Sequence, residues 1–178
     1  IPYKEKIIDY LDDLSDEAKE IGAVNCVLIE NGKKTGYNTD AFGFEKTLKI
    51  HRKPHQNTAL ILGNGGAAKA VEFVLNKNGI SSKTVSRNSD LNFENLDKET
   101  VENHKIIVQC TPVGTFPNID DCLNFPFGGL SKDHLVIDLI YNLNYSKFII
   151  QSAENDAKTV NGYYMLEQQA EKAWEIWN

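Results

Sequence analysis

Short apolar runs alternate with helix-like segments over most of the chain after residue 57. Four runs have the length and composition of strands buried in a sheet, and they cover residues 59–62, 83–86, 105–110 and 135–139. Helical spacing of apolar residues predicts helices over 67–75, 146–155 and 162–177, with a brief strand over 158–160. Residues 88–103 are polar and show no clear period. Strands that alternate with helices predict an α/β fold with a Rossmann-like, doubly wound parallel sheet.

The first fifty residues have a different pattern. In chain order, the expected elements are helices over 4–14 and 16–21, strands over 24–30 and 33–37, and a helix over 41–50. Ser15 is followed by two acids, which is typical of a helix N-cap. Asn31-Gly32, between the two strands, is a strong hairpin signal. Residues 51–57 are polar and contain a proline, so we expect a domain boundary there.

Composition excludes some functions. Of 178 residues, 41% are hydrophobic and 25% are charged, as in ordinary globular proteins, and the net charge of −6 argues against non-specific nucleic-acid binding. No apolar stretch is long enough for a membrane span, and the histidines show no metal-ligand spacing. Cys26, Cys110 and Cys122 lie far apart, which favours reduced thiols and a cytoplasmic protein. The chain begins at Ile1 without methionine, so we expect a fragment or a processed product.

A glycine-rich turn joins the strand over 59–62 to the helix that starts at Ala67. Its sequence is Gly63-Asn64-Gly65-Gly66, a variant of the dinucleotide-binding fingerprint. A strand, a glycine turn and a helix aim unpaired helix N–H groups at a phosphate. Alone the pattern is weak, because a glycine turn between a strand and a helix often has only a structural role.

The end of the second strand of this region indicates which dinucleotide would bind. NAD-binding sites usually have an acid there for the ribose 2′-hydroxyl, whereas this chain has Ser86-Arg87-Asn88. The planar donors of an arginine suit a 2′-phosphate, so the sequence favours NADP over NAD. The alternative is that Arg87 is one more surface arginine.

Further motifs accompany this turn along the chain. They are Ile1-Pro2-Tyr3-Lys4, Ile21-Gly22-Ala23-Val24-Asn25, Asn38-Thr39-Asp40 followed by Gly43, Gly63-Asn64-Gly65-Gly66-Ala67, Ser86-Arg87-Asn88, Thr111-Pro112-Val113-Gly114, Asp138-Leu139-Ile140-Tyr141, and Gly162 with Met165, Leu166 and Gln169. In this order they resemble the shikimate dehydrogenase family over nearly every segment of the chain. The resemblance implies an NADP-binding domain over 51–161, the C-terminal part of a smaller α/β substrate domain over 1–50, and a terminal helix over 162–178 that returns to the substrate domain.

The resemblance also implies an activity, the NADP-dependent, reversible reduction of 3-dehydroshikimate to shikimate in aromatic amino-acid biosynthesis. Lys4 and Asp40 would be the catalytic pair, because an ammonium group oriented by a carboxylate can donate a proton and stabilise a negative oxygen. Spacing alone favours a plainer role for both residues, with Lys4 a solvated lysine at a helix start and Asp40 a helix cap. The family match reverses that preference.

The remaining site residues come from the same resemblance. Substrate-binding residues would be Asn25, Asp40, Tyr141 and Gln169. Cofactor-binding residues would be Gly63, Asn64, Gly65, Gly66, Ala67, Ser86, Arg87, Thr111, Leu139 and Gly162. Considered without the resemblance, Asn25 is a polar residue at a strand edge, Tyr141 a packing residue, Gln169 a surface residue and Thr111 a strand cap. No metal is expected, and the expected partner is a small-molecule substrate, with no nucleic-acid or membrane partner, for a monomer or homodimer.

The chain also departs from the family pattern. Gln109 stands where asparagine is usual, Thr115 where methionine is usual, and Tyr164 where glycine is usual. The basic residue expected shortly after Arg87 is absent, and so is the N-terminal segment with paired serines that clamps the substrate carboxylate. Two alternatives therefore stay open, a non-catalytic NADP-binding fragment and a related quinate/shikimate dehydrogenase.

Overall fold

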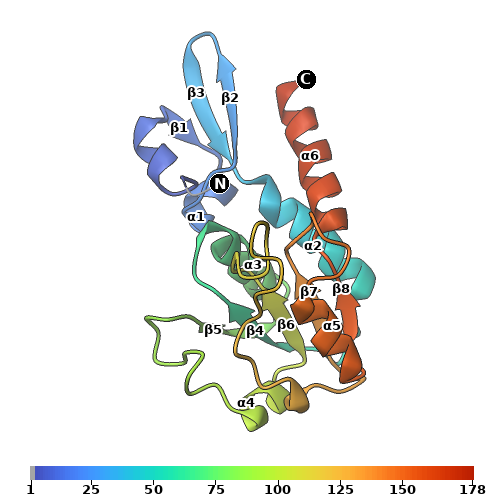
Figure 1. Ribbon diagram of the computed structural model, residues 1–178. Helices are drawn as coiled ribbons and strands as arrows, with labels where there is room; N and C mark the ends of the chain where they lie inside the picture. The colour runs from blue at the N-terminus through green and yellow to red at the C-terminus, as the bar shows by residue number, and fades with distance from the viewer. Residues whose placement is uncertain (1–2) are drawn as a thin grey trace.

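The computed structural model describes residues 3–178, so Ile1 and Pro2 of the first motif lie outside the described residues. The strands are β1 (Asp13–Leu14), β2 (Cys26–Glu30), β3 (Lys33–Tyr37), β4 (Thr58–Leu62), β5 (Ser81–Val85), β6 (Ile106–Gln109), β7 (Leu135–Asp138) and β8 (Lys158–Val160). The α-helices are α1 (Asp16–Ile21), α2 (Thr39–His51), α3 (Gly66–Lys77), α4 (Lys98–Asn103), α5 (Lys147–Glu154) and α6 (Tyr163–Trp177). Two 3₁₀ helices, η1 (Lys6–Tyr10) and η2 (Phe127–Gly129), complete the elements of this part (Figure 1).

The larger sheet has five parallel strands in the order β5-β4-β6-β7-β8, which confirms the predicted fold class. Side chains of one strand alternate between its two faces, and each face has its own core. Ile61, with Val108 and Ile137, packs under α2, α3 and α6. Leu60, with Ile107, packs on the opposite side against residues of α4 and α5. Burial on both faces explains why these strands appear in the sequence as continuous apolar runs.

The smaller sheet has the strand order β1-β3-β2 and lies above the larger one (Figure 1). Strands β2 and β3 form the expected hairpin, in which Asn31 and Gly32 have positive φ values of 51° and 80°. Both central residues of a type I′ turn need a positive φ, which is why Asn-Gly is favoured there.

The predicted helix over 4–14 is wrong. Only Lys6–Tyr10 is helical, as a 3₁₀ turn, and Leu11 is extended with φ −103° and ψ 148°. The chain then forms β1, which pairs with β3 in parallel. A Cβ on Gly36 would lie 2.5 Å from Leu11 Cδ1 and 2.8 Å from Leu14 Cδ2. The apolar spacing therefore serves packing against a glycine of the hairpin rather than a helical face.

Helices α2 and α4 also differ from the prediction. Helix α2 begins at Thr39 rather than at residue 41, because the Asn38 side chain accepts a bond from the Ala41 N–H and caps it. Helix α4 falls inside the polar segment 88–103, where Asp97 caps it through the Thr100 N–H at 2.7 Å. Its only buried residue is Val101, so it had no apolar period to detect.

Helix α6 returns from the end of β8 to α2 and reaches the hairpin (Figure 1). A Cβ on Gly43 would lie 2.5 Å from the Met165 carbonyl oxygen and 3.2 Å from the Gln169 nitrogen, so the glycine permits close helix contact. At the other end of α6, Trp177 Nε1 donates to the Val27 carbonyl at 3.1 Å. The division into residues 1–50, 51–161 and 162–178 stays a prediction. Over residues 3–178, every helix is too short or too polar to cross a membrane.

Candidate active site

Lys4, Asn25 and Asp40 meet where the small sheet joins α2. The Lys4 ammonium is paired with Asp40 Oδ2, and the side chains of Lys4 and Asp40 are only 19% and 10% exposed. Asn25 Nδ2 donates to the other carboxylate oxygen, Asp40 Oδ1, at 2.9 Å. The backbone fixes the lysine as well, because the Val24 N–H donates to the Lys4 carbonyl at 2.7 Å. The carboxylate is thus held through both oxygens by two predicted site residues.

Gln169 of α6 joins the same cluster through Thr39. Thr39 is 1% exposed and is the first residue of α2. Its hydroxyl lies 3.0 Å from Asn25 Nδ2 and 3.1 Å from Gln169 Oε1. Its N–H donates to Asn25 Oδ1 at 2.7 Å. The structure therefore brings together Lys4, Asn25, Asp40 and Gln169, which are far apart in the sequence.

This cluster retains unused hydrogen-bonding groups. Among residues 3–178, each carboxylate oxygen of Asp40 accepts one bond, so a further lone pair of each is available to a ligand. Gln169 Nε2 donates to the Leu166 carbonyl at 3.2 Å and has a second hydrogen. The ammonium of Lys4 has three hydrogens, of which Asp40 takes one. Donors and acceptors side by side suit a ligand with several hydroxyl groups, since each hydroxyl both donates and accepts.

The glycine turn joins β4 to α3 and borders this cluster. Gly63 has φ +111°, a conformation that side chains disfavour, and its N–H donates to the Val85 carbonyl at 2.8 Å. Gly65 precedes α3, offers no side-chain cap, and has open space where a Cβ would stand. A Cβ on Gly66 would lie 3.0 Å from Lys4 Cβ. The turn thus has an open side at Gly65 and a closed side at Gly66.

The C-terminal ends of the other strands lie at the same edge of the sheet. Ser86 follows β5, is buried, and shares a hydrogen bond with Ser89 Oγ at 2.8 Å. Arg87, the next residue, is exposed. Thr111 follows β6, and its methyl group would lie 3.1 Å from a Cβ on Gly63. Gly162 packs directly on the Leu139 backbone after β7, where a side chain would not fit. Tyr141, two residues after Leu139, is 44% exposed.

Two titratable groups, buried Asp138 and partly buried Cys110, lie at this edge. Burial raises the pKa of Asp138 to about 6, although the Ser146 hydroxyl and the Ile140 N–H donate to its carboxylate. Burial, with the carboxylates of Asp138 and Asp40 next, raises the pKa of the Cys110 thiol far above its usual range. A thiol held in its neutral form is a poor nucleophile, so this raised pKa disfavours a nucleophilic role for Cys110.

The chain is similar in sequence and in fold to known proteins. A family model for the shikimate dehydrogenase substrate binding domain matches residues 1–27. The NADP(+)-dependent shikimate dehydrogenase of Methanococcus maripaludis is 40% identical over an alignment 195 positions long, which covers 99% of this chain and 70% of that protein. The chain belongs to the shikimate dehydrogenase family.

Solved shikimate dehydrogenases have the same fold. The crystal structure of the Aquifex aeolicus shikimate dehydrogenase matches with a TM-score of 0.89 and 37% identity, over 100% of this chain and 70% of that one. The Thermus thermophilus shikimate dehydrogenase, solved in complex with NADP(H) and shikimate, matches with a TM-score of 0.87 and 30% identity, again over 100% and 70%. The two TM-scores show that the chain shares the three-dimensional arrangement of helices and strands with these enzymes.

The turn between β4 and α3 fits the NADP of the shikimate dehydrogenase family. Helix α3 is twelve residues long and its N-terminus has no side-chain cap, so first-turn N–H groups are available to a phosphate. The open space at Gly65 allows the close approach of a pyrophosphate. Within residues 3–178, no group of three or more His, Cys, Asp or Glu side chains could hold a metal ion.

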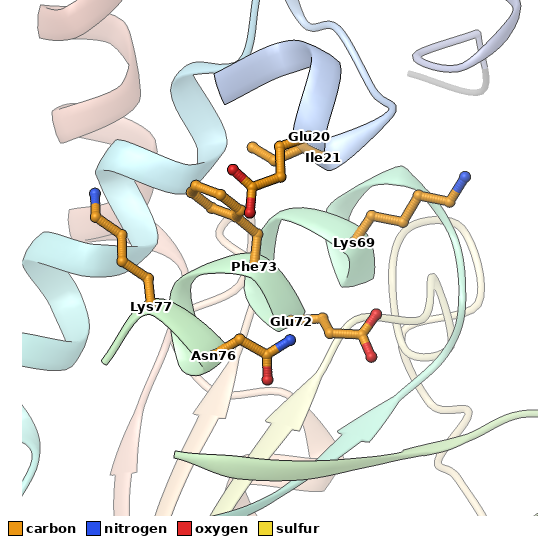
Figure 2. A pocket seen from close by; sticks show the side chains of 7 residues that line it. All are labelled: Glu20, Ile21, Lys69, Glu72, Phe73, Asn76 and Lys77. Carbon is orange, nitrogen blue, oxygen red and sulfur yellow. The ribbon is translucent and has the colours of Figure 1, made fainter. Parts of the chain in front are cut away.

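A groove elsewhere in the molecule does not coincide with this candidate site. It lies between α1 and α3, and Figure 2 shows Phe73 of α3 pointing towards Glu20 and Ile21 of α1. None of the predicted site residues lines it. Its lysines are partly engaged in ion pairs, Lys69 with Glu5 at 2.8 Å and Lys77 with Glu45 at 3.7 Å.

Sequence reasoning missed two polar residues of this candidate site. Thr39 was visible only as the middle residue of Asn38-Thr39-Asp40. Gln109 was noted as a departure from the family, but its role follows from the structure. It is fully buried, its Nε2 donates to the Val113 carbonyl at 3.2 Å, and its Oε1 accepts from the Thr111 N–H. Gln109 thus fixes the turn that carries Thr111.

Proposed function

We propose that this protein catalyses the NADP-dependent, reversible reduction of 3-dehydroshikimate to shikimate. The observation that carries the proposal is the Lys4–Asp40 ion pair, held by Asn25 and bordered by the glycine turn at Gly66. Family membership supports the same reaction, since the relatives are named as NADP(+)-dependent shikimate dehydrogenases.

Lys4 is the proposed proton donor to the carbonyl oxygen of the substrate. When bound, NADPH supplies the hydride that reduces the carbonyl carbon. The Lys4 ammonium gives a proton to the oxygen as negative charge develops there, and in the reverse direction it accepts that proton. Asp40 orients the ammonium through Oδ2, while Asn25 holds Oδ1 and so fixes the plane of the carboxylate. Partial burial strengthens this electrostatic stabilisation, because little water surrounds the pair.

The ring hydroxyls of the substrate are proposed to bind Asp40, Asn25 and Gln169, with Tyr141 at the outer rim. The unused lone pairs of Asp40 and Asn25 accept from hydroxyl groups, and the second Nε2 hydrogen of Gln169 donates to one. This complementarity supports a polyhydroxylated ring rather than an apolar substrate.

The cofactor is proposed to lie along the C-terminal edge of the larger sheet. Gly63, Asn64, Gly65, Gly66 and Ala67 would hold the pyrophosphate at the N-terminus of α3. Ser86 and Arg87 would bind the adenosine 2′-phosphate, and Thr111, Leu139 and Gly162 would line the nicotinamide end. Exposure of Arg87 supports this role, because its guanidinium is accessible to a ligand.

Location and assembly belong to the same proposal. We place the protein in the cytoplasm, as a monomer or homodimer. Support comes from Cys26, Cys110 and Cys122, which are all free, as expected in a reducing compartment.

The experiment follows NADPH formation with shikimate, and with quinate in parallel. One protein carries the family's N-terminal paired-serine segment ahead of residue 1, and the other is this chain alone. Shikimate-dependent turnover by the first supports the proposal. Higher activity with quinate than with shikimate would show that quinate is the preferred substrate. Tight NADPH binding by both proteins without turnover of either compound would favour the non-catalytic alternative.

A further inference from the structure

The hydroxyl of Thr39 lies at the centre of the side-chain cluster that we propose as the substrate site. It lies within hydrogen-bonding distance of Asn25 Nδ2 at 3.0 Å and of Gln169 Oε1 at 3.1 Å. Thr39 is 1% exposed, so its hydroxyl belongs to the protein interior rather than to the surface offered to a ligand. It joins the start of α2 to a residue of α6 that lies 130 positions further along the chain.

The directions of these bonds follow from a proton count. A threonine hydroxyl has one hydrogen and accepts with its lone pairs. It accepts from Asn25 Nδ2, since that amide nitrogen only donates. Asn25 Oδ1 already accepts from the Thr39 N–H at 2.7 Å and lies 3.3 Å from the hydroxyl, whereas Gln169 Oε1 is nearer at 3.1 Å. The single hydroxyl hydrogen therefore goes to Gln169.

This arrangement determines which group Gln169 offers. With Oε1 held by Thr39 and one Nε2 hydrogen held by the Leu166 carbonyl, the amide presents its second Nε2 hydrogen as a donor. Without the threonine hydroxyl, Oε1 loses its donor and only the Leu166 carbonyl holds the amide, so the second Nε2 hydrogen is no longer fixed in direction. Asn25 would at the same time lose the acceptor for one of its Nδ2 hydrogens.

We propose that Thr39 is a positioning residue that fixes the side-chain amides of Asn25 and Gln169 in the orientation needed to bind the substrate hydroxyls. This inference rests on the proposed function, because it assigns the two amides to that substrate. Thr39 touches neither the hydride nor the transferred proton. Its loss should therefore weaken substrate binding far more than turnover.

The first experiment compares Thr39→Val, which keeps the shape of the side chain, with Thr39→Ser, which keeps the hydroxyl. In the protein with the N-terminal segment, Thr39→Val should raise KM for shikimate about tenfold through the loss of two neutral hydrogen bonds. The kcat and the Kd for NADPH should stay close to the original values, and Thr39→Ser should restore KM. A normal KM in Thr39→Val, or an equal loss of NADPH affinity, would overturn the proposal.

A matched control separates this role from packing. Thr47 is fully buried on the same helix, and its hydroxyl donates to the Gly43 carbonyl at 3.0 Å. Thr47→Val removes a buried hydroxyl outside the cluster, so KM should not change. In a Gln169→Ala background, Thr39→Val should raise KM much less than in the original protein, since part of its effect passes through Gln169. Equal effects in both backgrounds would contradict that part of the proposal.

Ligand-free crystal structures decide the positioning role even if the protein does not oxidise shikimate. In Thr39→Val, the Gln169 amide should rotate or leave its place, while in Thr39→Ser it should stay. If Asn25 and Gln169 keep their positions in Thr39→Val, the positioning role is wrong. Failure of the original protein to turn over shikimate would instead count against the proposed function.

Discussion

Lys4 packs against Gly66, the first residue of α3. A Cβ on Gly66 would lie 3.0 Å from Lys4 Cβ and 3.3 Å from Lys4 Cδ, so hydrogen alone leaves room for the lysine stem. A second tie lies one residue further along, where Glu5 pairs with Lys69 of α3 at 2.8 Å. The proposed proton donor and the proposed phosphate site therefore share one helix as their support.

The open side of the glycine turn gives a clean test of cofactor binding. Gly65→Val places its side chain in open space in the free protein, so the fold should persist, with at most about 1 kcal/mol lost at the N-cap. The same side chain should block the pyrophosphate and reduce NADPH affinity by at least about a hundredfold in calorimetry. Gly128→Val, also in open space but in η2, is the control. Normal NADPH affinity of Gly65→Val would remove this turn from the site.

Arg87 tests the choice between NADP and NAD. Loss of charge-assisted bonds to a 2′-phosphate should cost about 1.5–3 kcal/mol, so Arg87→Ala should weaken NADPH about 10- to 100-fold. NADH lacks that phosphate and should bind almost as before. Lys132→Ala removes an exposed charge ahead of β7, at the opposite edge of the sheet, and should leave both cofactors unaffected. Equal weakening of both cofactors by Arg87→Ala in a binding titration would contradict the assignment.

The Lys4–Asp40 pair predicts a catalytic defect with little effect on the cofactor. In the protein with the N-terminal segment, Lys4→Ala or Asp40→Asn should reduce kcat by about 10²–10⁴-fold. NADPH affinity should change little, and the exposed neighbour Lys6→Ala should behave as the original protein. Because the two residues act as a unit, the double variant should be little worse than the worse single variant. Normal turnover of Lys4→Ala would rule this mechanism out.

Asp138 predicts how stability depends on pH. Its pKa is raised to about 6 in the folded protein, against about 4 in the unfolded chain. The folded state binds this proton more tightly than the unfolded chain does. Protonated Asp138 therefore stabilises the fold below pH about 4, and this stabilisation is lost as the pH rises to about 6. The Asp138→Asn variant has no carboxyl group to titrate here, so it does not lose stability in this way. Its free energy of unfolding, relative to that of the original protein, should rise by up to about 3 kcal/mol between these pH values, as measured by denaturant unfolding. A difference that is constant with pH would show that Asp138 does not titrate in this range.

Local patterns explain which parts of the fold could be predicted. The run over 59–62, the glycine turn and the helix after it depend on residues close in sequence, and the structure has them as β4, the turn and α3. The prediction of a helix over 4–14 was wrong because Leu11 and Leu14 pack against Gly36 of β3, and not along one face of a helix. Helix α4 could not be predicted because its one buried residue, a valine, gives no apolar periodicity.

The site too could be predicted only in part. Family motifs identify four site residues, Lys4, Asn25, Asp40 and Gln169, but no pattern along the chain predicts that Gln169 contacts Thr39. That meeting depends on α6 crossing α2 at Gly43, where a Cβ would collide with the Met165 carbonyl. The hydrogen-bond directions depend in turn on distances within the assembled cluster, which the sequence does not contain.

The last turn of α6 has a consequence for optical measurements. The sequence has two tryptophans, and both lie there, Trp174 with 65% exposure and Trp177 with its indole bonded to Val27 of the hairpin. Intrinsic fluorescence therefore reports on the contact between this helix and the small sheet, and not on the glycine turn. A change in tryptophan emission on addition of shikimate would reveal a change in the surroundings of the last turn of α6.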